Sequence, residues 1–131
     1  MCGGGAVGNI FSGIGNITGG LQADAEAKGN AKTVLSIAQS EAEKLRRQGK
    51  SNASSARAAA AENGLDVDQG AAAMLQDEHI GDAEYNASMT VAEAGHNASN
   101  IRRAGKMQRN NYGMKATSNF IGAGASIAGW K

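Results

Sequence analysis

The segment Asn63-Gly64-Leu65-Asp66-Val67-Asp68 decides the fold, because the sequence on both sides of it has the pattern of a long helix. Asn-Gly is a strong turn dipeptide, and the aspartates that follow it have side chains suited to capping a helix start. Before the turn, over about 21–62, and after it, over about 69–112, small and apolar residues recur at spacings of three and four. Two long helices joined by a short turn predict an all-α fold, a long antiparallel helical hairpin.

The predicted helices would pack through a narrow seam of small side chains, of the kind found in coiled coils. Small seam residues let two helix backbones approach closely. We expect the same seam to serve the contacts between copies of the chain in an oligomer. Its main positions are Leu35, Ala38, Ala42 and Leu45 in the first helix and Val91, Ala94, Ala98 and Ile101 in the second.

The composition explains why such a hairpin would need neighbours. The chain has 131 residues with 26 Ala, 19 Gly and no Pro, and only 28 apolar side chains are larger than Ala. Of these, 16 are spread over residues 21–113, too few for a thick core. Disorder is disfavoured because the net charge is only +1 and Ala is the strongest helix former. We therefore expect one subunit of a ring or tube rather than an ordinary monomeric enzyme.

Three segments differ in character. Residues 1–20 are Gly-rich, uncharged and apolar, residues 21–113 form the hairpin with its turn near 63–68, and residues 114–131 are again Gly/Ala-rich and apolar. The hairpin would bring the two apolar ends together. Polar residues among the glycines argue against a helix that crosses a membrane on its own.

Charge is sorted along the chain. Between Ala58 and Ile101 there are eight acids and no Lys or Arg, whereas outside that window there are 13 bases and four acids. A hairpin would place an acidic turn at one end and, at the other, a basic band level with Lys28 and Lys32. We expect this band to contact an anionic surface, either lipid headgroups or a nucleic-acid backbone. The residues predicted for that contact are Arg102, Arg103, Lys106, Arg109, Lys115, Trp130, Phe11 and Ile14.

No motif predicts catalysis, a cofactor or a metal site. Gly3-x-Gly5-x-x-Gly8 has the letters of a dinucleotide fingerprint but lacks the strand that must precede it. Glu93 and His96 have the spacing of a shared metal ligand pair, but a di-iron bundle needs a second such pair. We expect no enzyme activity, no cofactor and no small-molecule substrate.

Several stretches together resemble a known family. They are the Met1-Cys2 start with its small apolar run to Gly20, the helix opening at 22–28, the Ala-rich stretch 55–60 before the turn, the Arg-bearing second helix and a Gly/Ala/Ser tail at 121–129. In these features the chain is similar to the short internal virion proteins, or ejection proteins, of short-tailed bacteriophages (podoviruses), of the internal virion protein B type. The likeness is one of composition over most of the chain, and this chain is shorter and richer in Gly at its start than is usual in the family.

The resemblance implies a helical protein that is packed inside the capsid and expelled at infection. It would then form part of an oligomeric channel that conducts DNA through the host cell envelope. The implied partners are copies of itself, larger internal core proteins, the portal and the bacterial membrane, with DNA contacted nonspecifically if at all.

Two other functions stay open. One is a structural head, neck or portal-associated virion protein that stays in the particle. The other is a nonspecific DNA-binding or chaperone-like hairpin outside the virion, which the clustered acids make the weaker alternative.

Overall fold

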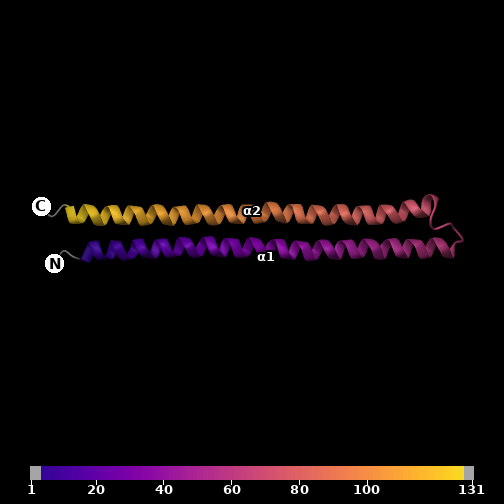
Figure 1. Ribbon diagram of the computed structural model, residues 1–131, viewed down its shortest axis with the longest axis horizontal. Helices are drawn as coiled ribbons and strands as arrows, with labels where there is room; N and C mark the ends of the chain where they lie inside the picture. The colour runs from indigo at the N-terminus through magenta and orange to yellow at the C-terminus, as the bar shows by residue number, and fades with distance from the viewer. Residues whose placement is uncertain (1–3, 129–131) are drawn as a thin grey trace. The chain divides into compact units, whose positions relative to one another are not determined.

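The computed structural model describes residues 4–128, with side chains placed for residues 8–126 and 128. It contains two helices, α1 (Gly4–Glu62) and α2 (Gly70–Ala128), of 59 residues each. A short connection at 63–69 reverses the chain, so the helices run antiparallel (Figure 1). The predicted all-helical hairpin is confirmed.

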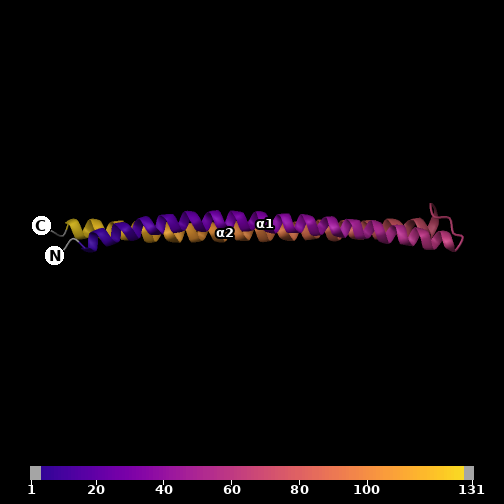
Figure 2. The ribbon, with the colours of Figure 1, turned by 90° about the horizontal axis from the view of Figure 1, so that it is seen from below.

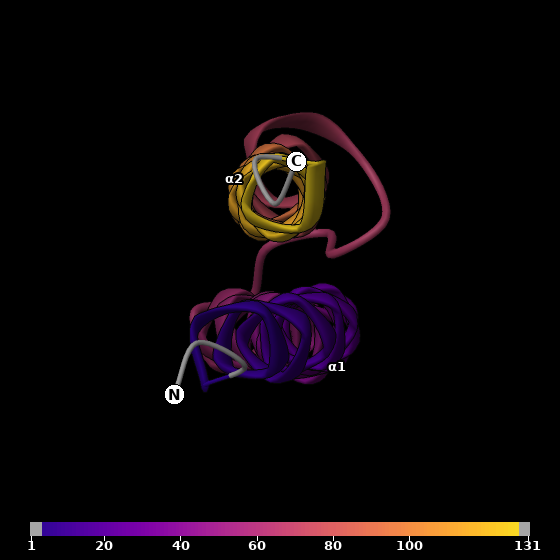
Figure 3. The ribbon, with the colours of Figure 1, turned by 90° about the vertical axis from the view of Figure 1, so that its left-hand side faces the viewer.

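The chain divides into two units. Unit 1 contains residues 1–32 and 98–131, and unit 2 contains residues 33–97 with the turn. Within each unit a stretch of α1 lies beside a stretch of α2, as both side views show (Figures 1 and 2). Figure 3, seen along the helices, shows the connecting segment of unit 2 projecting beside them.

The hairpin turn is a Schellman motif at the end of α1. Gly64 has a φ of 75°, in the left-handed region that glycine adopts without a steric penalty. Its N–H donates to the Ala61 carbonyl at 3.0 Å, and the Leu65 N–H donates to the Ala60 carbonyl at 3.0 Å. These two bonds satisfy carbonyls that the helix end leaves without partners. The turn predicted from Asn-Gly is therefore confirmed, and its mechanism is a helix C-cap.

The aspartates after the turn do not cap α2 as predicted. The Asp66 carboxylate accepts a hydrogen bond from the Asp68 N–H at 3.0 Å, and the Asp68 carboxylate pairs with Arg57 at 2.9 Å. Gln76 instead ties the connection to α2, because its Nε2 donates to the carbonyls of Val67 (2.8 Å) and Ala72 (3.0 Å). The side chains that could cap a helix are used to order the loop.

Both helices continue through the Gly-rich segments at the ends of the sequence. Gly13 and Gly20 of α1 are buried where α2 packs against them, Gly13 beneath the ring of Phe120 and Gly20 against the Cβ of Tyr112 and the backbone of Arg109. A Cβ built at Gly13 would lie 2.9 Å from the ring of Phe120, and one at Gly20 would lie 3.1 Å from the Cβ of Tyr112. Packing against these residues of α2 offsets the low helix propensity of glycine. The composition boundary at residue 20 is therefore not a helix boundary.

The buried apolar residues of the described part are all alanines. No described side chain larger than Ala is fully buried, and the one buried charged residue is Asp24. Buried glycines at positions 13, 20, 49 and 105 complete the seam. The ten buried alanines are Ala27, Ala31, Ala38, Ala42, Ala53, Ala87, Ala94, Ala98, Ala116 and Ala123.

The buried positions recur every eleven residues. On α1 one such set is Gly20, Ala31, Ala42 and Ala53, and on α2 it is Ala94, Gly105 and Ala116. Eleven residues in three turns is about 3.67 residues per turn, close to the 3.6 of a straight α-helix. The small side chains therefore stay on one face without the underwinding that the seven-residue repeat of a left-handed coiled coil imposes.

An internal repeat underlies the seam. Residues 30–50 and 86–106, offset by 56 positions, share the pattern Asn-Ala-x6-Ala-x3-Ala-x2-Leu/Ile-Arg-Arg-x-Gly-Lys. Both glycines of the pattern lie in close contact with the other helix. A Cβ at Gly49 would collide with the Cβ of Ala83 in unit 2, and one at Gly105 would collide with the Cβ of Ala27 in unit 1. The repeat thus supplies the same packing surface twice, once on each helix.

Candidate anion-binding site

The two units carry opposite net charges. Unit 1 has eight bases and two acids, a net charge of +6, and unit 2 has five bases and ten acids, a net charge of −5. The net +1 of the chain is therefore the sum of two strongly charged parts. Because bases outnumber acids in unit 1, cations without an acidic partner are expected there.

Several cations of unit 2 are neutralised by acids of the same unit. Arg46 of α1 forms a bidentate pair with Glu84 of α2, with Nε–Oε2 at 2.7 Å and Nη2–Oε1 at 2.9 Å. The hydrogen bond from Arg46 lowers the pKa of the Glu84 carboxyl below its ordinary value of 4.5. Arg47 pairs with Glu43 at 3.0 Å, one turn away on its own helix. Much of the positive charge of unit 2 is thus neutralised by ion pairs within the unit.

Unit 1 contains a groove lined by four cations. Asp24, Lys28 and Lys32 line it from α1, where a spacing of four places them one above another on the same face. Arg102 and Lys106 line it from α2, again four residues apart. The groove has a volume of about 460 Å³, within the range of sites that hold small molecules or headgroups.

Asp24 is the single acid of this groove. Its side chain is 10% exposed, and its Oδ2 lies 2.8 Å from Lys28 Nζ and 3.6 Å from Arg109 Nη1. The hydrogen bond from Lys28 and the charges of Lys28, Arg109 and Lys106 lower the pKa of Asp24 below its ordinary value of 3.8, against the opposing effect of burial. Asp24 is therefore ionised at neutral pH and holds Lys28 and Arg109 beside it.

The other cations of the groove have no acid. Within residues 4–128, Lys32, Arg102 and Lys106 form no direct ion pair. One carboxylate facing four lining cations leaves the groove with a net positive charge. Such a groove is suited to an anion that supplies several oxygen acceptors, such as a phosphate group.

Exposed apolar side chains flank the groove on both helices of unit 1. On α1 they follow a spacing of four, three and four at Ile10, Ile14, Ile17 and Leu21, and Phe11 is 70% exposed. On α2 they recur every seven residues at Met107, Met114 and Ile121.

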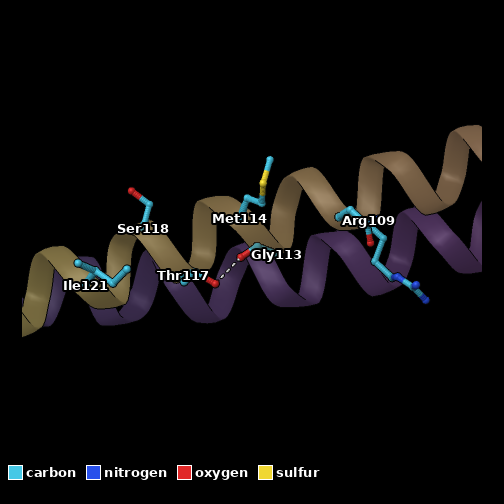
Figure 4. A pocket seen from close by; sticks show the side chains of 7 residues that line it. Arg109, Gly113, Met114, Thr117, Ser118 and Ile121 are labelled. Carbon is cyan, nitrogen blue, oxygen red and sulfur yellow. Dashed lines mark hydrogen bonds between the residues drawn. The ribbon is translucent and has the colours of Figure 1, made fainter.

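A shallow depression on α2 extends from Arg109 to the exposed apolar residues of the same helix. Met114, Thr117 and Ile121 line it further along, and all of its lining residues come from α2 alone. Met114 and Ser118 point away from α1 (Figure 4), and the Thr117 hydroxyl donates to the Gly113 carbonyl at 3.0 Å. The depression is an outer helix surface, not an enclosed cavity.

The structure gathers some of the predicted contact residues and separates others. Arg102 and Lys106 line the groove, and Arg109 approaches Asp24. Arg103 is exposed outside the groove lining, and Lys115 Nζ lies 5.9 Å from the centroid of the Tyr112 ring. Phe11 and Ile14 are exposed on α1 of the same unit, while Trp130 lies outside the described residues.

The predicted seam residues divide by size. The four alanines are buried and the four larger residues are half-buried, all within a single chain. Their use between copies stays a prediction. The residues concerned are Ala38, Ala42, Ala94 and Ala98, and Leu35, Leu45, Val91 and Ile101.

Asp24 was not among the residues predicted for this surface. Its signal in the sequence is the Asp24–Lys28 spacing of four, which forms an ion pair on a helix. That spacing alone does not distinguish it from other surface pairs of the chain. Only the packing of α2 over this turn of α1 buries the carboxylate.

Among residues 4–128, no group of three or more His, Cys, Asp or Glu side chains is arranged to hold a metal ion. In the same range neither helix has a stretch both long and apolar enough to cross a membrane. Comparison with models of protein families, with curated proteins and with solved structures finds no match to this chain.

Proposed function

We propose that the chain is a non-enzymatic internal virion (ejection) protein of the kind that its sequence resembles. It is packed in the capsid and then becomes part of a homo-oligomeric ring or tube that conducts DNA through the host cell envelope. In that assembly unit 1 faces the anionic membrane, and larger core proteins and the portal are further partners. The channel and the membrane contact are the parts that experiments can test directly.

The observation that carries the proposal is that the large apolar side chains are exposed while the buried apolar residues are alanines. Among the residues whose side chains are described, the hairpin buries alanine and leaves 16 large apolar side chains exposed, nine of them in unit 1. Exposed apolar surface on this scale is typical of chains that bind other proteins or membranes. A monomeric hairpin would leave it in water, so neighbours are expected on both units.

The charges support the membrane side of the proposal. Anionic headgroups attract basic segments, and apolar side chains beside the cations add burial at the interface. Unit 1 combines net positive charge with exposed residues such as Phe11, Ile14 and Ile121. Since α1 and α2 are not apolar enough to cross a bilayer, the expected contact lies at the headgroup level.

The particle experiment measures this protein by quantitative mass spectrometry before and after the particles release their DNA. An ejection protein should be lost with the DNA. Retention at the original copy number would overturn the proposal and support the alternative, a structural head, neck or portal-associated protein that stays in the particle.

The channel is tested with the purified full-length chain in planar bilayers that contain anionic lipid. We expect discrete conductance steps, together with a single oligomer size by native mass spectrometry. A chain that is monomeric at micromolar concentration and never permeabilises the bilayer would contradict the channel.

A further inference from the structure

We infer that the groove formed by Asp24, Lys28, Lys32, Arg102 and Lys106 is a binding site for the phosphate of an anionic phospholipid headgroup. The inference rests on the proposed membrane contact of unit 1. It goes further, because it assigns the contact to one groove, with one acid in a defined role, rather than to a diffuse basic surface.

The internal repeat provides the strongest argument. In unit 2 the first Arg of the repeat, Arg46, is neutralised by a bidentate pair with Glu84. The equivalent of Arg46, 56 positions later, is Arg102, and the equivalent of Glu84, 56 positions earlier, is Lys28. Both line the groove of unit 1. In unit 2 the arginine of the repeat is therefore neutralised by an acid on the facing helix. In unit 1 the equivalent position on the facing helix holds a second cation, so the equivalent arginine has no acid opposite it.

This exchange has a cost within the isolated chain. Like charges on facing helices repel, and the repulsion is relieved only by a counter-charge. Asp24 supplies part of it, but its carboxylate already accepts Lys28 at 2.8 Å and lies 3.6 Å from Arg109. Arg102, Lys106 and Lys32 are therefore the donors that remain for an external anion.

A phosphate group suits these donors. Arg presents parallel N–H donors that match two phosphate oxygens, and Lys adds point charges beside them. Asp24 acts as a positioning residue, because it holds Lys28 at the groove wall and limits the net charge of the site. The chain attached to such a phosphate would extend along the exposed apolar side chains that flank the groove.

The surroundings favour a lipid over a nucleic acid. Leu21, one turn before Asp24, is 62% exposed, and Met107, next to Lys106, is 61% exposed. These side chains would meet the acyl boundary beneath a headgroup, whereas a DNA backbone offers them nothing apolar to contact. The ten acids of unit 2 also make that unit repel a polyanion such as DNA.

The test uses the full chain and vesicles of phosphatidylcholine with or without phosphatidylglycerol, at fixed ionic strength. The central variant is Lys28→Glu, which gives unit 1 the acid that unit 2 has at the equivalent position. The change removes the ion pair between Lys28 and Asp24, but the new carboxylate can pair with Arg102, so the hairpin should stay helical by circular dichroism. We expect its affinity for the anionic vesicles to fall about tenfold or more, because the change removes an attractive charge near the surface and adds a repulsive one.

The matched control is Lys44→Glu. It changes the net charge by the same amount at an exposed residue of unit 2 that forms no ion pair among the described residues. Its affinity for the vesicles should stay within about twofold of the unchanged chain. Equal losses in both variants would overturn the groove in favour of diffuse attraction.

The remaining outcomes separate the sources of phosphate and the two proposals. Displacement from vesicles by millimolar inorganic phosphate at constant ionic strength, or tighter binding to duplex DNA that Lys28→Glu abolishes, would overturn the lipid assignment. If the unchanged chain prefers anionic vesicles and Lys28→Glu keeps that preference, the groove fails and the membrane contact stands. If the unchanged chain shows no preference, the membrane contact fails as well.

Discussion

Single glycines have opposite effects in this hairpin, according to what lies across from them. Gly49 and Gly105 lie where a methyl group would collide with an alanine Cβ, which is fixed to the backbone and cannot turn away. Gly81 and Gly95 both lie in α2, with nothing within 4 Å of the position of a Cβ. The first pair is required by close packing, and the second only weakens the helix.

Gly49→Ala should therefore destabilise the hairpin, by about 1–3 kcal/mol, because the helices must separate or shift to admit the methyl group. The measurement is chemical denaturation followed by circular dichroism. The control Gly95→Ala should stabilise the protein by about 0.5–1 kcal/mol, through helix propensity alone. Exchanging the partners, in Gly49→Ala with Ala83→Gly, should restore part of the loss, and an unchanged loss would show that the seam is not the cause.

Asp24 makes stability depend on pH. Its pKa is lower in the folded chain than the ordinary value of 3.8, so the folded state binds this proton more weakly than the unfolded state. The stabilisation is fully present above about pH 4 and is lost as the pH falls through the lowered pKa. Glu84 acts in the same direction from its ordinary value of 4.5.

We expect the melting temperature to fall as the pH drops below about 4.5, first through Glu84 and below about pH 4 also through Asp24. The fall below about pH 4 should be smaller in Asp24→Asn, which has no carboxyl to protonate. Thermal unfolding at a series of pH values checks this. Parallel curves for the two proteins would contradict the assignment of Asp24 as a contributor.

At the level of the elements, the turn fixes where α1 ends, and the repeat fixes which faces of α1 and α2 pack together. The Schellman motif ends α1 at Glu62 and depends on the positive φ of Gly64. The repeat then presents the same Ala and Gly surface from α2 that α1 presents to it. The two helices therefore pack through the same pattern of small residues in both units.

Gly64→Ala should cost about 1–2 kcal/mol, because an L-residue with a Cβ is strained in the left-handed region. Gly64→Asn is the matched comparison and should cost less, since Asn tolerates this conformation better than Ala does. Denaturation midpoints of the three proteins test the order. An equal cost for Ala and Asn would show that the left-handed turn is not what stabilises the end of α1.

For the molecule as a whole, the opposite net charges of the two units predict attraction between copies. Unit 1 at +6 and unit 2 at −5 can neutralise each other when unit 1 of one copy meets unit 2 of another. Exposed apolar side chains on both units, such as Phe11 in unit 1 and Met74 in unit 2, would be covered in the same contact.

Self-association should therefore weaken with salt, because screening at 0.5 M shortens the range of exposed charges to a few ångströms. Sedimentation velocity of the full chain at about 20 mM and 500 mM NaCl measures this, and we expect smaller species at high salt. Larger species at high salt would indicate that apolar burial alone holds the copies together.

The sequence by itself determined the helices, the turn and the sorting of charge. These features depend on local propensity, on the Asn-Gly signal and on counting, which need no knowledge of distant contacts. The helix ends were beyond it, because α1 continues through Gly13 and Gly20, which pack against Phe120 and Tyr112 of a distant part of the sequence. The reuse of Asp66 and Asp68 inside the loop was also set by the folded arrangement.

Only the tertiary structure decided which charges are satisfied. Arg46 and Arg102 stand in the same local sequence, Arg-Arg-x-Gly-Lys, and nothing within that motif distinguishes them. Their difference lies across the seam, where one faces Glu84 and the other shares a groove with Lys28. The free energy of a charge depends on its neighbours in space, and pairing the helices in one register fixed which neighbours each arginine has.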